Sequence, residues 1–356
     1  MNAVPSPDAS PDAVPGIDHA PVERWIAANV PGVVPPLRFS LISGGHSNIT
    51  YFVDDSAGFR AVVRRPPLGS HGGNAHDMGR EFRVIDALNG SAVPVPKALA
   101  LCTDEAVNGS PFYVMGCVPG QVVDNPGRVE SFLPGAAARR RAGEQIVDVM
   151  AALHQVDIDA VGLGQSARRE GFLDRQLKRL VSVWAQNKTR ELPLMEELRT
   201  RLIELKPEQR YTGIVHSDYR MGNVMFDADG TLTGVLDWVL WTLGDPLSDL
   251  GFMLNNWYEP GDTTPQVWME VPPTLAGGFL SRDEVLARYA ERTGFDVSGI
   301  QYYRAFQHWK IAVIAEGVKR RYENAAMASN DVDFEHLSQR VVNMAELAND
   351  LLRDLG

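Results

Sequence analysis

The stretch HSDYRMGN at residues 216–223 decides the fold. It follows a short apolar run, GIV at 213–215, and a second apolar run further along ends at Asp237. The order is therefore an acid, an amide and a second acid: Asp218, Asn223 and Asp237. The apolar runs beside them have the length of short strands. Turns also use Asp, Asn and Gly, but few chemistries need this order with apolar runs on both sides.

Kinase-type phosphotransferases use this order for a catalytic base and two Mg²⁺ ligands. Asp218 can accept the proton of an attacking hydroxyl group and orient that group. Asn223 offers an amide oxygen and Asp237 a carboxylate, which are hard ligands that suit Mg²⁺. We place His216 with Asp218 in the catalytic group, and we expect its ring to support the loop by packing and hydrogen bonding rather than to move protons.

Length and local patterns predict an α+β fold with two lobes. With 356 residues the chain exceeds one simple core, and strand-like runs dominate its first third. Residues 1–18 repeat Ser-Pro-Asp-Ala and are expected to form a disordered tail. We expect a small β-rich nucleotide-binding lobe over 19–118. A larger helical lobe over 119–356 should carry the catalytic loop and the acceptor site.

A glycine turn is predicted near the start of the β-rich lobe, where residues 41–53 are typical of strand, turn and strand. Gly44 and Gly45 let backbone N–H groups approach an anion, while Ser47 and Asn48 add donors. An ordinary hairpin turn is the alternative. No helix follows directly, so the segment is not the G-x-G-x-x-G of a dinucleotide-binding fold.

A cation and a carboxylate lie on the next two predicted elements. Arg64 falls near the end of a strand over 59–65, and Glu81 lies on a helix over 78–88. Such a pair can hold the phosphates of a nucleotide. From these residues alone, an exposed Arg and a solvated helical Glu remain the alternative.

A third feature of this lobe is the apolar strand over 111–118, which ends at a Gly/Pro hinge. The backbone near Met115 and Cys117 can offer donors and acceptors to an adenine edge.

The rest of the chain is largely helical by its periodicity. Expected helices cover 142–156, 172–186, 194–205, 283–293 and 301–322, and expected short strands cover 213–215, 223–226 and 232–236.

Charge and composition exclude several kinds of partner. A formal net charge of −11 argues against nucleic acid. Apolar runs of membrane-spanning length are missing, as is a secretory signal pattern, so we expect no membrane partner. Only two cysteines occur, without metal-ligand spacing. A cytoplasmic location is the expectation.

The sequence resembles the aminoglycoside phosphotransferase family of kinase-like enzymes. The likeness rests on residues 216–223, on LDW at 236–238 and on GDPLSD at 244–249, and it covers roughly residues 38–325. A closer likeness is to the kinase-like domain found fused to acyl-CoA dehydrogenases. It is carried by VVRRPP at 62–67, REF at 80–82 and the pattern from Trp309 to Tyr322.

This resemblance implies a protein-kinase-like fold and an ATP- and Mg-dependent transfer to a hydroxyl of a small molecule. It also implies Asp218 as base, Asn223 and Asp237 as metal ligands, and Arg64 with Glu81 as the phosphate-holding pair. The family usually has Lys where Arg64 stands, and Arg is not a simple replacement. Asp249 is expected to cap the following helix or to brace the catalytic loop, with metal binding as the alternative.

The acceptor is open among several small alcohols. The closer likeness suggests a hydroxyacyl thioester. If four basic residues line one helical face, they could meet the phosphates of a CoA-like handle on it: Lys310, Lys319, Arg320 and Arg321. Surface charge is the alternative for these four residues. Two other functions compete with a small-molecule kinase. One is a nucleotide-binding regulator without turnover, and the other is a protein Ser/Thr kinase, which the missing D-F-G and A-P-E segments disfavour.

Overall fold

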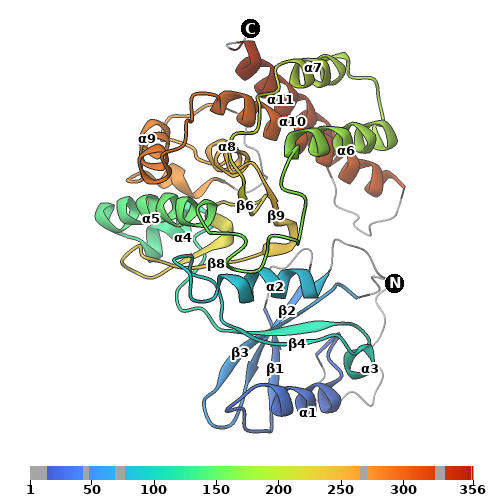
Figure 1. Cartoon of the computed structure of the whole chain (residues 1–356), viewed down its shortest axis with the longest axis vertical. Helices are drawn as coiled ribbons and strands as arrows, with labels where there is room; N and C mark the ends of the chain where they lie inside the picture. The colour runs from blue at the N-terminus through green and yellow to red at the C-terminus, as the bar shows by residue number, and fades with distance from the viewer. Residues whose placement is uncertain are drawn as a thin grey trace. The chain divides into compact units, whose positions relative to one another are not determined.

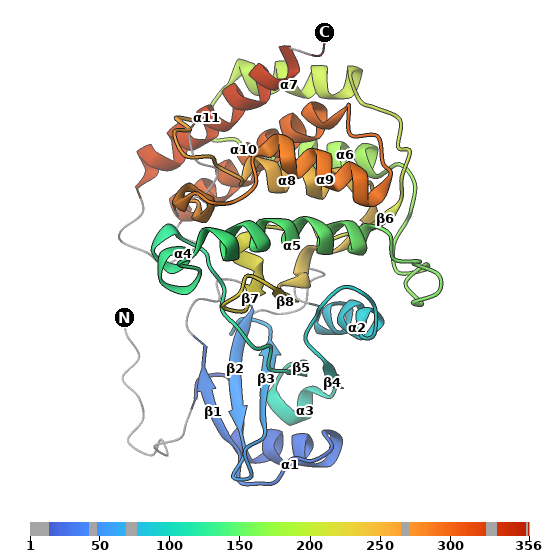
Figure 2. The same cartoon turned by 90° about the vertical axis from the view of Figure 1, so that its left-hand side faces the viewer.

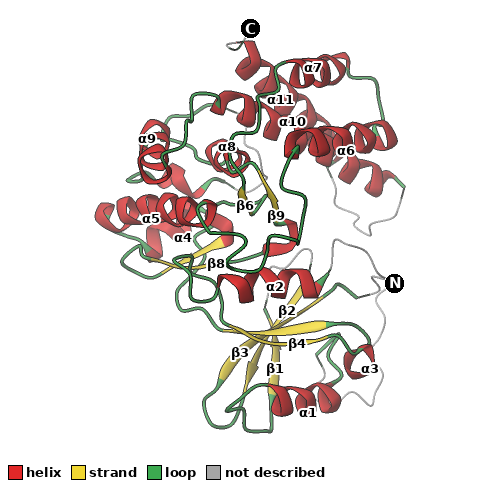
Figure 3. Ribbon diagram, viewed as in Figure 1, coloured by secondary structure: helices red, strands yellow, loops and turns green. Residues whose placement is uncertain are grey.

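The computed structural model describes most of the chain, namely residues 14–42, 48–68, 77–264, 271–324, 333–353 and 355. The chain forms two compact units. The first contains residues up to Pro119 together with Gly234–Leu240, and the second contains Gly120–Thr233 together with the residues from Trp241 onward. The first unit holds a small antiparallel sheet and the second is mainly helical (Figure 3). The predicted α+β class is therefore confirmed.

The sheet of the first unit has five strands in the order β1-β2-β3-β5-β4 (Figure 1). All neighbouring strands are antiparallel. In the register, Arg64 of β3 lies opposite Thr50 of β2 and Tyr113 of β5. The strands are β1 (Arg38–Leu41), β2 (Ile49–Asp54), β3 (Arg60–Arg65), β4 (Ala98–Cys102) and β5 (Phe112–Gly116).

The two faces of this sheet carry different neighbours. Helix α1 (His19–Asn29) packs Val22 and Ile26 into an apolar core that includes Val63 and Val114. Side chains alternate along a strand, so Arg64 points to the opposite face from Val63. That opposite face meets α2 (Met78–Leu88), which contacts β4 and β5. The short α3 (Glu105–Asn108) contacts α1.

Helix α2 carries a carboxylate on its buried side. Asp77 caps the helix by accepting the Arg80 backbone N–H at 3.0 Å. Met78, Ile85 and Leu88 recur at helical spacing and are buried, and Glu81 lies on the same side among them. A buried carboxylate needs a partner, and the sheet face opposite provides one.

The second unit is built around helix α10 (Ile300–Glu323). This helix contacts α6, α7, α8 and α11, and Figure 2 shows it surrounded by helices. Among the described residues, no helix combines the length and apolar character that crossing a membrane requires. The other helices are α4 (Pro126–Phe132), α5 (Ala136–His154), α6 (Phe172–Asn187), α7 (Pro193–Glu204), α8 (Leu247–Asn255), α9 (Arg282–Thr293) and α11 (Phe334–Arg353).

Short strand pairs carry the sequence motif. β6 (Gly213–Val215) pairs with β9 (Thr242–Gly244), and β7 (Val224–Phe226) pairs with β8 (Leu232–Val235). The turn between β7 and β8 closes where Asp227 accepts the backbone N–H of Thr231 at 2.9 Å. Residues 216–223 therefore link two strands, as the sequence predicts. The 3₁₀ turns within the described residues are η2 (Met221–Asn223), η3 (Trp238–Leu240) and η4 (Pro273–Ala276).

Candidate active site

Arg64 joins two acids in the first unit. Its Nε lies 3.0 Å from Glu81 Oε2, and its Nη2 lies 2.7 Å from Asp237 Oδ1. The predicted pairing of Arg64 with Glu81 is confirmed. The structure also shows a contact that was not predicted: Asp237, just after the C-terminal end of β8, binds the same arginine. Two charge-assisted hydrogen bonds on one guanidinium fix the orientation of all three side chains.

Glu81 is held from several sides and is only 2% exposed. Besides Arg64, it accepts hydrogen bonds from Asn48 Nδ2 at 2.6 Å and from the Tyr113 hydroxyl at 3.2 Å. Burial raises the pKa of Glu81, and the neighbouring Arg64 acts in the opposite direction. Burial also tends to lower the pKa of Arg64, but the acidic groups around it outweigh this effect and raise it.

Asp237 is more accessible than Glu81, because 35% of its side chain is exposed. Its backbone has a φ of 60°, in the left-handed region that non-glycine residues rarely adopt. The 3₁₀ turn that follows is tied down by Arg80, whose Nη1 donates to the Val239 carbonyl at 3.1 Å. Backbone strain of this kind is found where a side chain must be aimed for function.

The other candidate nucleotide contacts are placed only in part. Met115 lies on β5 opposite Val62 of β3, and Cys117 follows the strand with an exposed side chain. Asn48 is buried, and its amide nitrogen is bound to Glu81. Gly44, Gly45 and Ser47 lie outside the described residues.

Asp218 and Asn223 are brought together in the second unit. Asn223 Nδ2 donates to the Asp218 carbonyl at 2.8 Å and to its carboxylate Oδ2 at 2.7 Å. Arg220 Nε lies 3.4 Å from Asp218 Oδ1. The Asn223 amide is thus oriented with its nitrogen toward Asp218. Its oxygen is the atom that could bind a metal ion.

Asp249 braces the loop that carries these residues. Its carboxylate accepts the backbone N–H groups of His216 at 2.6 Å and of Ser217 at 2.8 Å, and Ser217 has a φ of 72°. His154 Nε2 lies 3.3 Å from the same carboxylate. Burial tends to raise the pKa of Asp249, but these partners outweigh it and lower the pKa. The expected bracing role is confirmed.

His216 supports the loop from within the protein. Its side chain is fully buried, and its Nδ1 accepts the Asp218 backbone N–H at 3.3 Å. The ring also stands edge-on to Tyr219 at 5.9 Å. These contacts match the packing and hydrogen-bonding role expected from the sequence. A ring without surface exposure is poorly placed to exchange protons with a substrate.

Lys310 is a member of this site whose position was not expected. Its Nζ donates to the Ser217 carbonyl at 3.4 Å and lies 5.3 Å from the centre of the Phe252 ring. Burial lowers its pKa to about 8, while Asp218 and Asp249 act to raise it. Surface charge is the wrong interpretation for Lys310 and for Lys319, because each is only 8% exposed. The signal in the sequence was a lone Lys inside an apolar helical run.

The chain matches the model of the phosphotransferase enzyme family over residues 38–303. This match covers most of the chain, and the chain belongs to that family. One solved structure is that of a Ralstonia eutropha protein assigned to the aminoglycoside phosphotransferases. Its sequence is 31% identical to this chain. The two align over 94% of this chain and 98% of the other, with a TM-score of 0.80. This likeness confirms the kinase-like fold.

Two further similarities bear on the closer relationship. Acyl-CoA dehydrogenase family member 10 of Mus musculus is 30% identical over 325 residues, covering 90% of this chain and 30% of the mouse protein. The chain spans about two fifths or less of the curated relatives it matches. The amicoumacin kinase hAmiN, solved with AMP-PNP, Ca²⁺ and Ami, covers 92% of each chain with 15% identity and a TM-score of 0.59. That last likeness concerns the fold.

Proposed function

We propose that the protein is an ATP- and Mg-dependent phosphotransferase that moves the γ-phosphate to a hydroxyl of a small molecule. The observation that carries the proposal is the 2.7 Å hydrogen bond between Asn223 Nδ2 and Asp218 Oδ2. It orients a partly exposed carboxylate and an amide oxygen within one braced loop. Family membership supports the same chemistry.

Asp218 is the proposed base. The acceptor oxygen attacks the γ-phosphorus, the new O–P bond forms, and the bond from phosphorus to the β,γ-bridging oxygen breaks. ADP leaves, and the hydroxyl proton passes to the Asp218 carboxylate. Because the transition state is loose, orientation of the hydroxyl is the larger part of this role. His216 and Asp249 act as positioning residues that keep the loop in shape.

The side chains present suit a nucleotide with Mg²⁺. Asp237 and Asn223 offer a carboxylate and an amide oxygen, which are ligands that Mg²⁺ accepts. When bound, the ion would neutralise charge on the phosphates. Arg64 would hold the phosphates, and Glu81 would fix its orientation. The proposed adenine and phosphate contacts of the backbone are those near Met115 and Cys117 and in the glycine turn over Gly44, Gly45, Ser47 and Asn48.

Arg64 can serve where the family usually has Lys, because its guanidinium is a fork. Nε is bound to Glu81 and Nη2 to Asp237, while Nη1 lies 3.5 Å from Thr50 Oγ1. A planar fork matches two phosphate oxygens better than a point charge does. In this proposal, phosphate oxygens compete with Asp237 for the Nη2 edge and leave the Glu81 contact in place.

A hydroxyacyl thioester is the acceptor that we propose to test first. The reason is the similarity of this chain to part of a protein named for acyl-CoA dehydrogenases. We place the acceptor site in the helical lobe over 119–356 and nucleotide binding in the lobe over 19–118.

A nucleotide-binding regulator without turnover is the second candidate. The ion pair between Arg64 and Asp237 favours it, because the pair occupies the carboxylate that a metal ion would need. The two candidates differ in one measurement. The enzyme transfers ³²P from labelled ATP to a hydroxyl compound, whereas the regulator binds Mg-ATP and transfers nothing.

The test is transfer of label from γ-³²P-ATP across a panel of hydroxyacyl thioesters, free hydroxy acids, sugars and aminoglycosides, with Mg²⁺ and with EDTA. We expect Mg-dependent labelling of at least one class of acceptor. Mg-dependent binding of AMP-PNP without any labelling would support the regulator. Absence of both binding and labelling would contradict the nucleotide proposal itself.

A further inference from the structure

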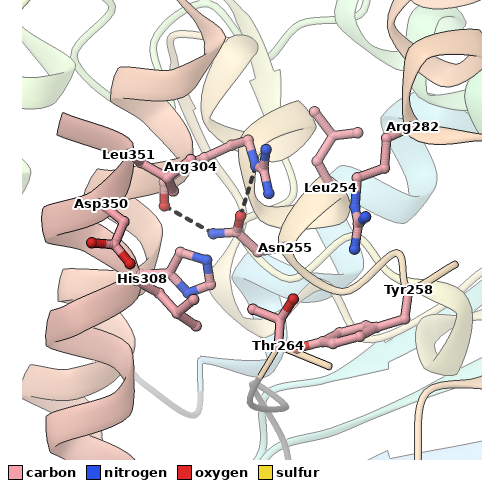
Figure 4. A pocket seen from close by; sticks show the side chains of 10 residues that line it. Leu254, Asn255, Tyr258, Thr264, Arg282, Arg304, His308, Asp350 and Leu351 are labelled. Carbon is pink, nitrogen blue, oxygen red and sulfur yellow. Dashed lines mark hydrogen bonds between the residues drawn. The ribbon is translucent and has the colours of Figure 1, made fainter. Parts of the chain in front are cut away.

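A cavity of about 210 Å³ lies in the helical unit, away from the catalytic loop. Side chains from α8, α10 and α11 and from the start of α9 enclose it (Figure 4). Three leucines give it an apolar wall, and two arginines, a histidine and an aspartate add polar groups. Its lining consists of Leu254, Asn255, Tyr258, Thr264, Arg282, Arg304, His308, Leu347, Asp350 and Leu351.

Arg304 lines this cavity, and Asp262, which is itself paired with Arg282, is the acid that acts on it from a distance. Its Nε donates to Asn255 Oδ1 at 3.1 Å and its Nη1 to Gln301 Oε1 at 3.2 Å. Within the part of the chain that the structure describes, no carboxylate lies within ion-pair distance of Arg304. Burial and the nearby Arg282 lower its pKa to about 10 against the opposing effects of Asp262 and Tyr258, so it stays charged at neutral pH. The hydrogen bonds of this guanidinium go to amides, and Asp262 is shared with Arg282, so an added anion would give Arg304 a carboxylate or phosphate partner of its own.

Arg282 supplies a second guanidinium at the start of α9. It is paired with Asp262, and its Nη1 lies 3.7 Å from Glu259. Its Nε has no hydrogen-bond partner among the described residues. The acids largely balance its charge, and that N–H is buried. Figure 4 shows the side chains of Arg282 and Arg304 at the same cavity.

His308 provides the third polar contact, one helical turn after Arg304. It is only 4% exposed, and its Nδ1 has no hydrogen-bond partner within the described ranges. Burial and Arg304 lower its pKa to about 3, so the ring is neutral. The residue lines the cavity, so a ligand that reaches the ring could satisfy this buried nitrogen.

We propose that this cavity binds a compact organic oxyanion, a carboxylate or a phosphate monoester, through Arg304 with support from Arg282 and His308. The guanidinium of Arg304 would take the oxyanion, since planar forks match carboxylate and phosphate geometry. A short apolar body would lie against Leu254, Leu347 and Leu351. This site is separate from the residues assigned to nucleotide binding and transfer.

Asp350 allows a second test of the proposal, in which a substitution should strengthen anion binding instead of weakening it. It lines the same cavity from α11, is largely exposed and pairs with Arg353 at 3.1 Å. A carboxylate there repels an incoming anion. Removing its charge should therefore tighten binding, whereas removing the charge of Arg304 should weaken it. Asp350→Asn alters an exposed residue and leaves the fold intact even if Arg304→Gln does not.

The experiment is titration calorimetry of the full chain with phosphate, glycerol phosphate, butyrate and neutral butyramide at constant ionic strength. We expect one site for an anion and none for butyramide. Arg304→Gln should weaken the anion at least about tenfold, and Asp350→Asn should tighten it severalfold. Glu323→Gln and Glu346→Gln, exposed charges on the same two helices, should leave anion affinity unchanged. The carboxylate and phosphate arms show which oxyanion the site prefers.

Arg64→Gln separates this cavity from the proposed nucleotide site, where phosphate could also bind. Anion binding that persists in Arg64→Gln supports the cavity, and binding that disappears in that variant while circular dichroism shows the native fold overturns it. The proposal is also overturned if Asp350→Asn leaves anion affinity unchanged, or if no anion of the panel binds. These binding measurements do not require transfer activity, so they test the cavity independently of the proposed function.

Discussion

Arg64 forms a 2.7 Å ion pair with Asp237, although 173 residues separate them in the chain. The same guanidinium holds the buried Glu81 through its Nε. Asp237 is therefore neutralised by a cation that belongs to the sheet. A metal ion bound by Asp237 would replace that cation and would free one edge of Arg64 for phosphate oxygens.

The first prediction concerns Asp237→Ala. Loss of the carboxylate removes a charged metal ligand, so Mg-AMP-PNP should bind at least about tenfold more weakly. The affinity for AMP-PNP measured with Mg²⁺ should then differ less from the affinity measured with EDTA. Glu81 still holds Arg64, so the fold should persist. Titration calorimetry measures both effects, with the exposed Asp229→Ala as control. If Asp237→Ala binds Mg-AMP-PNP as tightly as the natural protein does, Asp237 is not a metal ligand.

A second prediction concerns stability of the Arg64 cluster. Arg64→Gln leaves Glu81 buried without its cation and should lower the free energy of unfolding by about 3–5 kcal/mol. The double variant Arg64→Gln with Glu81→Gln should recover much of this loss, because the uncompensated charge is gone. Urea unfolding measures each value. Arg60→Gln, which breaks an exposed pair with Asp54, should change the free energy of unfolding far less than Arg64→Gln does.

The third prediction concerns acid sensitivity through Asp249. Its pKa is lower in the folded protein, so its ionised form stabilises the fold above the ordinary carboxyl pKa. That contribution disappears as the pH falls through the lowered folded value. Asp249→Asn should cost about 3 kcal/mol at pH 7, and the difference from the natural protein should shrink below about pH 4. A pH-independent difference in urea unfolding would contradict this, and Asp283→Asn is the exposed control.

Lys310 gives the fourth prediction. Its ammonium holds the Ser217 carbonyl beside the proposed base, so Lys310→Met should lower the transfer rate about tenfold with unchanged Mg-AMP-PNP affinity. Replacing a buried cation by an apolar side chain of similar length should leave stability intact. Lys319→Met is the matched control, because Lys319 is equally buried on the same helix but contacts Thr189. Equal rates for the two variants would remove Lys310 from the site.

Much of the first unit was predictable from local patterns. The expected helix over 78–88 coincides with α2. The two elements alone left the pairing of Arg64 with Glu81 open, and the family resemblance implied it. The loop 216–223 lies between short strands as expected. These features depend on spacing within a few tens of residues, which a sequence shows directly.

Other features depend on contacts that local sequence does not encode. Helix α8 is buried along its whole length, so it lacks the polar face that periodicity would reveal. Helix α11 has a regular apolar stripe that includes Leu337, Val341 and Met344, a signal that was present but overlooked. The meeting of Arg64 with Asp237 and the burial of Lys310 arise only when distant segments pack together.

The most direct test of the proposed chemistry is Asp218→Asn under single-turnover conditions, with an acceptor found in the panel. The prediction is Mg-AMP-PNP affinity within about twofold of the natural protein and transfer of labelled phosphate at least about a hundredfold slower. Transfer at the natural rate in Asp218→Asn would contradict the assignment of Asp218 as the base.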